Sequence, residues 1–321
     1  MCAVSQLLSQ NEIERFSRHL LIPEVGLAGQ KKLKGSRVLL VGLGGLGSPA
    51  AYYLAASGIG TLGIVENDRI EAANLHRQIL YSVSDIGKLK VDAAREKLSR
   101  MNEFMEIKIY PERLTSRNAL KILEPYDIII DGTDNFPTRY LVNDAGVFLK
   151  KPTVYGSVYR FEGRAALFYA ERGPCYRCLY DEIPPANVFS NCAESGVFGI
   201  LPGVIGMIQA TEAIKWIMGI GESLLGRLLI YDALKMSFRE MQIAKNERCA
   251  ICGIHPVRTS LKDDETTCRV TPESDNVPEI TPQDLIKEMA DNKNLLLIDV
   301  REEEEWNSGH LKKARHIPLA A

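Results

Sequence analysis

The stretch Ser36-Arg-Val-Leu-Leu-Val-Gly42-Leu-Gly44-Gly-Leu-Gly47 decides the fold of this chain. Its apolar half has the length of a buried β-strand, and the residues after the glycines follow a helical pattern through Ala56. Gly42, Gly44 and Gly47 therefore lie in the first turn between a strand and a helix, where nucleotide phosphates can bind. Sites for NAD and for ATP share this turn, so the turn alone leaves the nucleotide open.

Strands and helical stretches continue to alternate downstream of the glycine turn. Residues 61–66 and 126–131 have the pattern of buried strands, with a helical stretch at 91–98 between them. This alternation predicts an α/β fold with a Rossmann-like, doubly wound and mostly parallel sheet, whose ligands bind at the carboxyl ends of the strands. Glu66 ends the second strand at the position expected of an acid that binds the ribose.

Polar residues beyond the glycine turn favour ATP over NAD. Arg77 and Lys90 are cations that suit triphosphate oxygens, and Asp134 suits Mg²⁺, with Asn135 beside it as a further nucleotide contact. An NAD-dependent oxidoreductase would leave these groups unexplained. The alternatives are that Arg77 and Lys90 are solvated surface charges and that Asp134 caps a helix beginning near Phe136.

Two cysteine pairs share the spacing of a zinc knuckle, namely Cys175 with Cys178 and Cys249 with Cys252. Four thiolates can close a tetrahedral structural zinc site that keeps no open position for catalysis. In the cytoplasm thiols stay reduced, so such pairs favour metal over disulfide. We therefore expect a cytoplasmic protein stabilised by structural zinc.

The composition predicts a globular chain of 321 residues, 45% of them hydrophobic and 25% charged, with a formal charge of −2. That charge argues against a nucleic-acid partner, and no apolar run reaches the length that spans a membrane. Residues 1–255 read as the main domain, 256–278 as a polar linker and 279–321 as a small α/β segment. The helix expected at 202–218 is apolar on most faces, so it needs cover from the core or from a second subunit in a homodimer.

Taken together, these motifs resemble the MoeB/ThiF/HesA family, relatives of ubiquitin-activating enzymes. The resemblance implies adenylation, with ATP and Mg²⁺, of the C-terminal glycine of a ubiquitin-like sulfur carrier of the MoaD or ThiS type. It also implies release of pyrophosphate, a homodimer, and a sulfur donor such as a cysteine desulfurase or a rhodanese. A non-catalytic, zinc-bearing scaffold for a ubiquitin-like partner is the alternative. The matching segments are Arg15-Phe-Ser-Arg18-His, Gly42 to Gly47, Asn74-Leu-His-Arg77-Gln, Lys90, Thr133-Asp134-Asn135, Pro174-Cys-Tyr-Arg-Cys178 and Cys249-Ala-Ile-Cys252.

The resemblance also implies roles for single residues. Arg18 would reach the ATP bound by the neighbouring subunit, the alternative being a surface arginine, and Asn74 would contact the nucleotide. Cys192 would form a covalent link to the carrier, the alternative being an exposed or packing thiol. The ribose-binding acid of the family is usually Asp, so Asp68 competes with Glu66 for that role.

The segment from residue 280 resembles the start of a rhodanese domain. Asp299, Arg301, Trp306 and Gly309-His310 carry this resemblance, and no cysteine follows Cys268. We therefore expect no sulfurtransferase activity from this segment. The product supplied by the carrier stays open among molybdopterin, thiamine, thiolated tRNA, cysteine and a peptide.

Overall fold

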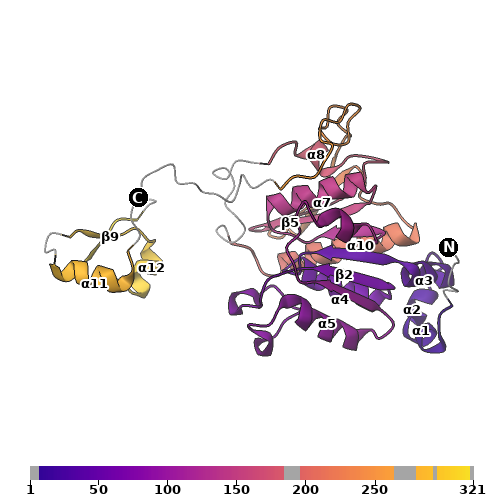
Figure 1. Ribbon diagram of the computed structural model, residues 1–321. Helices are drawn as coiled ribbons and strands as arrows, with labels where there is room; N and C mark the ends of the chain where they lie inside the picture. Colours follow the sequence, from indigo (N-terminus) through magenta and orange to yellow (C-terminus); the bar gives the residue numbers. More distant parts are fainter. Residues whose placement is uncertain (1–6, 184–195, 264–279, 292–294, 319–321) are drawn as a thin grey trace. The chain divides into compact units, whose positions relative to one another are not determined.

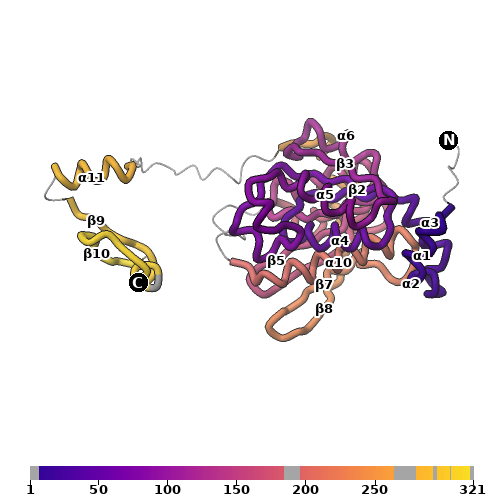
Figure 2. Tube along the Cα trace, turned by 90° about the horizontal axis from the view of Figure 1, so that it is seen from below, coloured from indigo at the N-terminus to yellow at the C-terminus, as the bar shows by residue number. Residues whose placement is uncertain are grey.

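The structure is a computed structural model that describes residues 7–183, 196–263, 280–291 and 295–318 (Figures 1 and 2). The chain forms two compact units, residues 1–270 and 271–321. The predicted linker falls largely on residues outside the described ranges, so its boundaries stay predictions.

The first unit is built on one large sheet. Within its described residues eight strands form the sheet order β3-β2-β1-β4-β5-β6-β7-β8. The strands from β3 to β5 in this order run parallel to one another, and β6, β7 and β8 each run antiparallel to the strand before them. This confirms the mostly parallel α/β fold, although the sequence patterns did not predict β3. The strands are β1 (Arg37–Val41), β2 (Thr61–Val65), β3 (Glu106–Tyr110), β4 (Ile128–Asp131), β5 (Thr153–Tyr159), β6 (Glu162–Phe168), β7 (Arg227–Asp232) and β8 (Ser237–Gln242).

Helices cover both faces of this sheet. Val38 and Leu40 of β1 lie in one core with α4 and α5, whereas Leu39 and Val41 lie in a second core with α6 and α7. Successive strand residues point to opposite faces, so a strand covered on both sides must be apolar throughout. Figure 1 shows α7 on one side of the sheet and α4 with α5 on the other. These helices are α3 (Gly26–Gly35), α4 (Gly47–Ser57), α5 (Lys90–Met101), α6 (Ala119–Leu123), α7 (Phe136–Phe148), α8 (Tyr176–Leu179) and α10 (Leu201–Met218).

The N-terminal residues form two short helices behind a capping box at Ser9. Ser9 and Glu12 form the box, but α1 (Gln10–Arg15) ends before Phe16 and α2 (Ser17–Leu20) follows it. Phe16 has φ −96° and ψ 13° and is buried, with its ring against Gly58. Tertiary packing of this ring therefore overrides the local helical pattern and separates α1 from α2.

The apolar helix α10 is covered mainly by its own chain. It packs against α3, α4, β5 and β6, and among its large apolar residues Met207 is the exposed one. Its apolar character therefore reflects the core and carries no argument for a homodimer. No helix in the described part of the chain is both long and apolar enough to cross a bilayer.

The second unit joins the residues that carry the rhodanese resemblance. Its strands β9 (Leu297–Asp299) and β10 (Ala314–His316) pair in parallel, beside α11 (Pro282–Asp291) and α12 (Glu303–Ser308). Arg301 donates to the Asp299 carboxylate at 2.7 Å, and the Trp306 ring stacks on His310 with centroids 3.5 Å apart.

Candidate active site and metal centre

A cavity of about 810 Å³ lies where the strands of the first unit end. The sheet order places Glu112, after β3, at one side of this cavity and Arg164, on β6, at the other. Neighbouring strands are about 4.8 Å apart, so the four spacings from Glu66, after β2, to Arg164 span about 19 Å of it. It has room for a nucleotide and a second substrate side by side. The predicted residues in its lining are Gly42, Gly44, Glu66, Asp68, Arg77, Lys90, Asp134 and Asn135.

The three glycines of the turn meet different constraints. Gly42 has φ +87°, in the left-handed region that favours glycine. A Cβ on Gly47 would lie 2.2 Å from the Gly42 carbonyl oxygen, so Gly47 lets α4 start directly against the turn. A Cβ on Gly44 would meet nothing nearer than the Gln78 amide nitrogen at 3.7 Å. Gly42 and Gly47 thus serve packing, whereas Gly44 faces open cavity.

Glu66 ties the end of β2 to the glycine turn. Its carboxylate accepts the backbone N–H groups of Leu43 at 3.0 Å, Asn67 at 2.8 Å and Asp68 at 3.0 Å. Lys90 Nζ lies 2.9 Å from Asp68 Oδ2 and 3.8 Å from Glu66 Oε2. Because Lys90 is only 4% exposed, the alternative of a solvated surface charge is wrong for this lysine.

Arg77 and Asn74 come from the segment after β2 and differ in their access to the cavity. Arg77 lines it, with its guanidinium donating to the Ala73 carbonyl at 2.9 Å. Asn74 does not line it, because its side-chain oxygen accepts the Glu71 N–H at 3.1 Å and closes the 3₁₀ turn η1 (Ala72–Asn74). A nucleotide contact by either residue stays a prediction.

The structure separates the two roles considered for Asp134, which are Mg²⁺ binding and capping of the helix that begins near Phe136. The side-chain oxygen of Asn135 accepts the Thr138 N–H at 3.0 Å and caps α7, which begins at Phe136 as predicted. The alternative that Asp134 caps α7 is therefore wrong. Its exposed carboxylate lines the cavity and has no hydrogen-bond or ion-pair partner among the described residues. Mg²⁺ commonly takes one such carboxylate beside phosphate oxygens, so this donor fits the ion.

The sequence analysis missed Arg139, which is buried one helical turn after Asn135. Its Nη2 donates to the Thr133 carbonyl at 2.8 Å, and its Nε lies 3.5 Å from Asp131 Oδ2. Burial by itself lowers the pKa of Arg139, but Tyr155 and Asp131 raise it above its ordinary value, so the guanidinium stays charged. Its position in the first turns of a helix that starts at the cavity was the only available signal.

Four tyrosines that the sequence analysis also missed line the β5–β6 end of the cavity, namely Tyr155, Tyr159, Tyr176 and Tyr180. Tyr176 has its ring centroid 5.3 Å from that of Tyr155 and 5.2 Å from that of Tyr180. Arg164 donates to the Tyr180 hydroxyl at 3.0 Å and to the Glu162 carboxylate at 2.8 Å. This end therefore presents a cation and flat aromatic surface instead of a glycine turn.

The four predicted cysteines meet in one cluster whose sulfurs all lie within 4.8 Å of one another. Sγ of Cys175 is 3.9 Å from that of Cys178 and 3.6 Å from that of Cys249, and Cys178 Sγ is 3.4 Å from Cys252 Sγ. Metal–sulfur bonds of about 2.3 Å in a tetrahedron place sulfurs about 3.8 Å apart, whereas a disulfide needs about 2.05 Å. The donor set thus fits a tetrahedral thiolate metal site. The hydrogen bond with Cys175 lowers the pKa of the Cys178 thiol below its ordinary value.

The remaining predicted site residues are Arg18 and Cys192. Arg18 is exposed on α2 and is absent from the lining of its own chain's cavity. Cys192 lies outside the described residues, so its predicted covalent link to a carrier stays a prediction.

Comparisons with known proteins show the family of the chain. Residues 16–251 match the ThiF family, and residues 281–321 match the rhodanese-like domain. The sulfur carrier protein adenylyltransferase of Thermus thermophilus is 49% identical over 265 residues, which are 81% of this chain and 98% of that protein. The probable adenylyltransferase/sulfurtransferase MoeZ of Mycobacterium tuberculosis is 45% identical over 321 residues, or 97% of this chain and 80% of that one.

Solved structures show the same fold at lower identity. MccB of E. coli superposes with a TM-score of 0.68 at 22% identity, covering 80% of this chain and 76% of that chain. PaaA superposes with a TM-score of 0.64 at 24% identity, covering 76% of this chain and 77% of that chain. On the family match and the two close relatives, the chain is a member of the ThiF family that carries rhodanese-like sequence at residues 281–321.

Proposed function

We propose that this protein uses ATP to adenylate the C-terminal glycine carboxylate of a ubiquitin-like sulfur carrier protein, releasing pyrophosphate. One observation carries the proposal: a single cavity joins a glycine turn, an unpaired carboxylate at Asp134, and a tyrosine-walled end that contains the Arg164–Glu162 ion pair. Relatives named as sulfur carrier protein adenylyltransferase and as adenylyltransferase/sulfurtransferase support the same reaction.

ATP would bind at the β1–β2 end of the cavity. The glycine turn offers backbone N–H groups to the phosphates, and Gly44 leaves space for them. Glu66 is held by three backbone N–H groups, so we assign the ribose to it in preference to the more exposed Asp68. Lys90 would exchange its contact with Asp68 for the phosphates, beside Arg77.

Asp134 would hold Mg²⁺ in the middle of the cavity. The ion, when bound with ATP, supplies positive charge that offsets the charge on the phosphates. The structure supports this role because Asn135 takes over the capping of α7 and leaves the Asp134 carboxylate unpaired.

The chemical step brings two anions together. A carboxylate oxygen of the carrier bonds to the α-phosphorus, the bond from that phosphorus to the oxygen bridging to the β-phosphate breaks, and pyrophosphate leaves with the electron pair. Arg77 and Lys90 offset the like charges of carboxylate and phosphate, and Arg164 draws the anionic carrier tail to the tyrosine-walled end.

The remaining assignments concern zinc, assembly and location. We propose that the four cysteines hold one structural zinc, since their separations suit it. We propose a homodimer in which Arg18 serves the partner's site, because Arg18 lies away from its own cavity. A cytoplasmic location accords with four cysteines kept as thiols for a metal.

Carrier-dependent exchange of pyrophosphate with ATP tests the proposed reaction. With a purified carrier of the MoaD or ThiS type, Asp134→Ala should lower the exchange rate by at least about 10²-fold, because the charge on the phosphates is then poorly offset. Asp92→Ala is the matched control: Asp92 is an exposed acid on α5 that pairs with Arg95 and lies outside the cavity.

The carrier provides a second control. A carrier lacking its terminal glycine should still bind the protein but support no exchange, since its carboxylate cannot reach the α-phosphate. If Asp134→Ala exchanged pyrophosphate at the wild-type rate, the assignment of this site would be wrong. A non-catalytic scaffold would bind the carrier and exchange nothing even as the wild type.

A further inference from the structure

The metal centre and the cavity wall share one short segment. Cys175 and Cys178 enclose Tyr176 and Arg177, which belong to α8. Tyr176 is 2% exposed and lines the cavity, whereas Arg177 is 4% exposed and points to Asp144 on α7. We call the tyrosine-walled end of the cavity, near Arg164, the acceptor end. A shift of the cysteines would therefore also shift a wall of this acceptor end.

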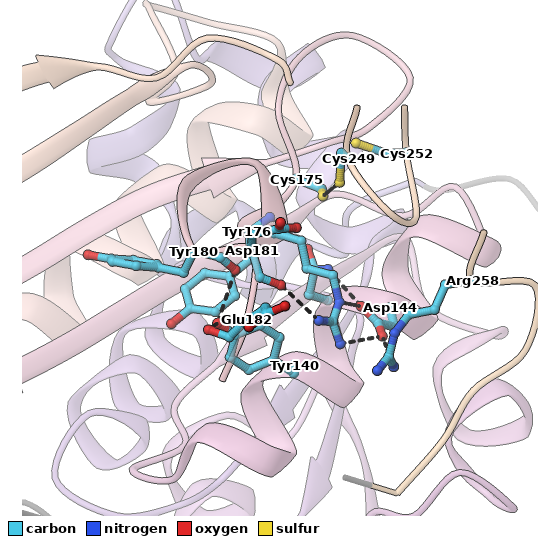
Figure 3. A network of polar contacts seen from close by, with 12 residues as sticks. Tyr140, Asp144, Cys175, Tyr176, Tyr180, Asp181, Glu182, Cys249, Cys252 and Arg258 are labelled. Atoms are coloured by element: carbon cyan, nitrogen blue, oxygen red, sulfur yellow. Dashed lines mark hydrogen bonds and ion pairs between the residues drawn. The ribbon is translucent and has the colours of Figure 1, made fainter. Parts of the chain in front are cut away.

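The buried carboxylate of Asp144 binds Arg177, inside the first cysteine pair, and Arg258, which follows the second pair. Figure 3 shows Asp144 beside Arg258. Asp144 accepts two hydrogen bonds from Arg177, at 2.7 Å and 2.9 Å, and one from Arg258 at 3.1 Å. The backbone N–H of Arg258 donates to the Ala250 carbonyl at 2.9 Å, inside the second cysteine pair. Asp144 thus bridges two parts of the chain that carry two metal ligands each, and the bidentate contact fixes the orientation of Arg177.

Neighbours of Asp144 on α7 hold the same segment further along. The Asn143 side-chain oxygen accepts the Tyr176 N–H at 2.7 Å. The Tyr140 hydroxyl donates to the carbonyls of Tyr180 at 3.0 Å and Glu182 at 2.6 Å (Figure 3). Helix α7 therefore sets the positions of both Tyr176 and Tyr180, the two wall residues nearest the cysteines in sequence.

We propose that Asp144 is a positioning residue that couples the four-cysteine metal centre to the acceptor end of the cavity. By binding Arg177 and Arg258 it sets the separation of the two cysteine pairs and keeps Tyr176 and Tyr180 in the wall that meets the carrier's C-terminal tail. The part of this proposal that concerns the carrier depends on the proposed function. Neutralising Asp144 would remove the charge that the buried Arg177 and the partly exposed Arg258 share, so both contacts would weaken and the segment that carries Arg177 would shift.

The test compares Asp144→Asn with Asp85→Asn in the full, zinc-loaded chain. Asp85 is a matched control because it is also buried and pairs with two cations, Lys88 and Lys97, outside the cavity. Zinc affinity is measured by competition with a chromogenic chelator, and the KM values for carrier and for ATP are measured separately by pyrophosphate exchange. Asp144→Asn should lower zinc affinity about 10–100-fold and raise the KM for carrier on the order of 10-fold, with the KM for ATP unchanged.

Each outcome decides the proposal. A merely structural role would reduce the amount of folded enzyme, and so kcat, while zinc affinity and both KM values stayed at wild-type levels; this would overturn it. A changed zinc affinity with an unchanged KM for carrier would also overturn the coupling. If Asp144→Asn does not fold, Arg258→Gln replaces it, since this variant removes only one of the two arginine contacts. Its zinc affinity and its KM values for carrier and ATP are measured and interpreted as for Asp144→Asn. If wild-type protein shows no exchange, the proposed function fails, whereas the zinc comparison still tests the effect of Asp144 on the metal centre.

Discussion

Two glycine-to-alanine substitutions in the glycine turn should affect different properties: Gly47→Ala the stability of the fold, and Gly44→Ala the binding of ATP. In Gly47→Ala the new Cβ would lie 2.2 Å from the Gly42 carbonyl oxygen, whereas ordinary contacts begin near 3.4 Å. The backbone would have to separate by about 1 Å in a turn that is also confined by Gly132. Overpacking costs about 1–3 kcal/mol, and a clash with backbone belongs at the upper end of this range, whereas the better helix propensity of alanine offsets about 1 kcal/mol. We expect a net loss of about 2 kcal/mol and a Tm lower by about 4–8 °C.

Gly44→Ala should leave stability almost unchanged. The nearest atom to its Cβ is 3.7 Å away, which is an ordinary contact, so the free energy of unfolding should change by less than about 0.5 kcal/mol. The methyl group would instead occupy the space that we assign to the phosphates. The KM for ATP should therefore rise about 10-fold or more, which corresponds to about 1.4 kcal/mol.

Thermal unfolding by circular dichroism and the KM for ATP in pyrophosphate exchange measure the two effects separately. Gly47 does not line the cavity, so Gly47→Ala should alter the KM for ATP less than Gly44→Ala does. A wild-type Tm for Gly47→Ala would refute the packing argument. A Tm loss in Gly44→Ala equal to that in Gly47→Ala, with an unchanged KM, would refute the division of roles within the turn.

The remaining predictions concern zinc and assembly. We expect about one zinc per chain, and Cys249→Ser should lose it together with thermal stability, because three thiolates no longer close the tetrahedron. Metal analysis that finds no zinc in freshly purified, reduced wild-type protein would contradict this. A mixture of the Arg18→Ala and Asp134→Ala proteins should regain part of the pyrophosphate exchange that each variant lacks, since their heterodimer holds one complete shared site. If the subunits exchange but no activity returns, each site lies within one subunit.

Local sequence determined the glycine turn and the strand ends. An apolar strand, a glycine turn and a helix are encoded by adjacent residues, so Gly42 to Gly47 and the start of α7 at Phe136 could be predicted from pattern and steric preference. The x₂ spacing of the cysteines likewise predicted a four-thiolate cluster, because two residues on one tight turn can bind the same ion.

Tertiary structure decided which side chains meet. Asp144 is 33 residues from Arg177 and 114 from Arg258, and no local period relates them, so only the packing of α7 against both cysteine pairs joins the three. Lys90 likewise pairs with Asp68, where sequence alone allowed a surface charge, because β2 ends beside the start of α5. Sequence patterns encode preferences of neighbouring residues, whereas a buried charge finds its partner only when distant elements pack in one register.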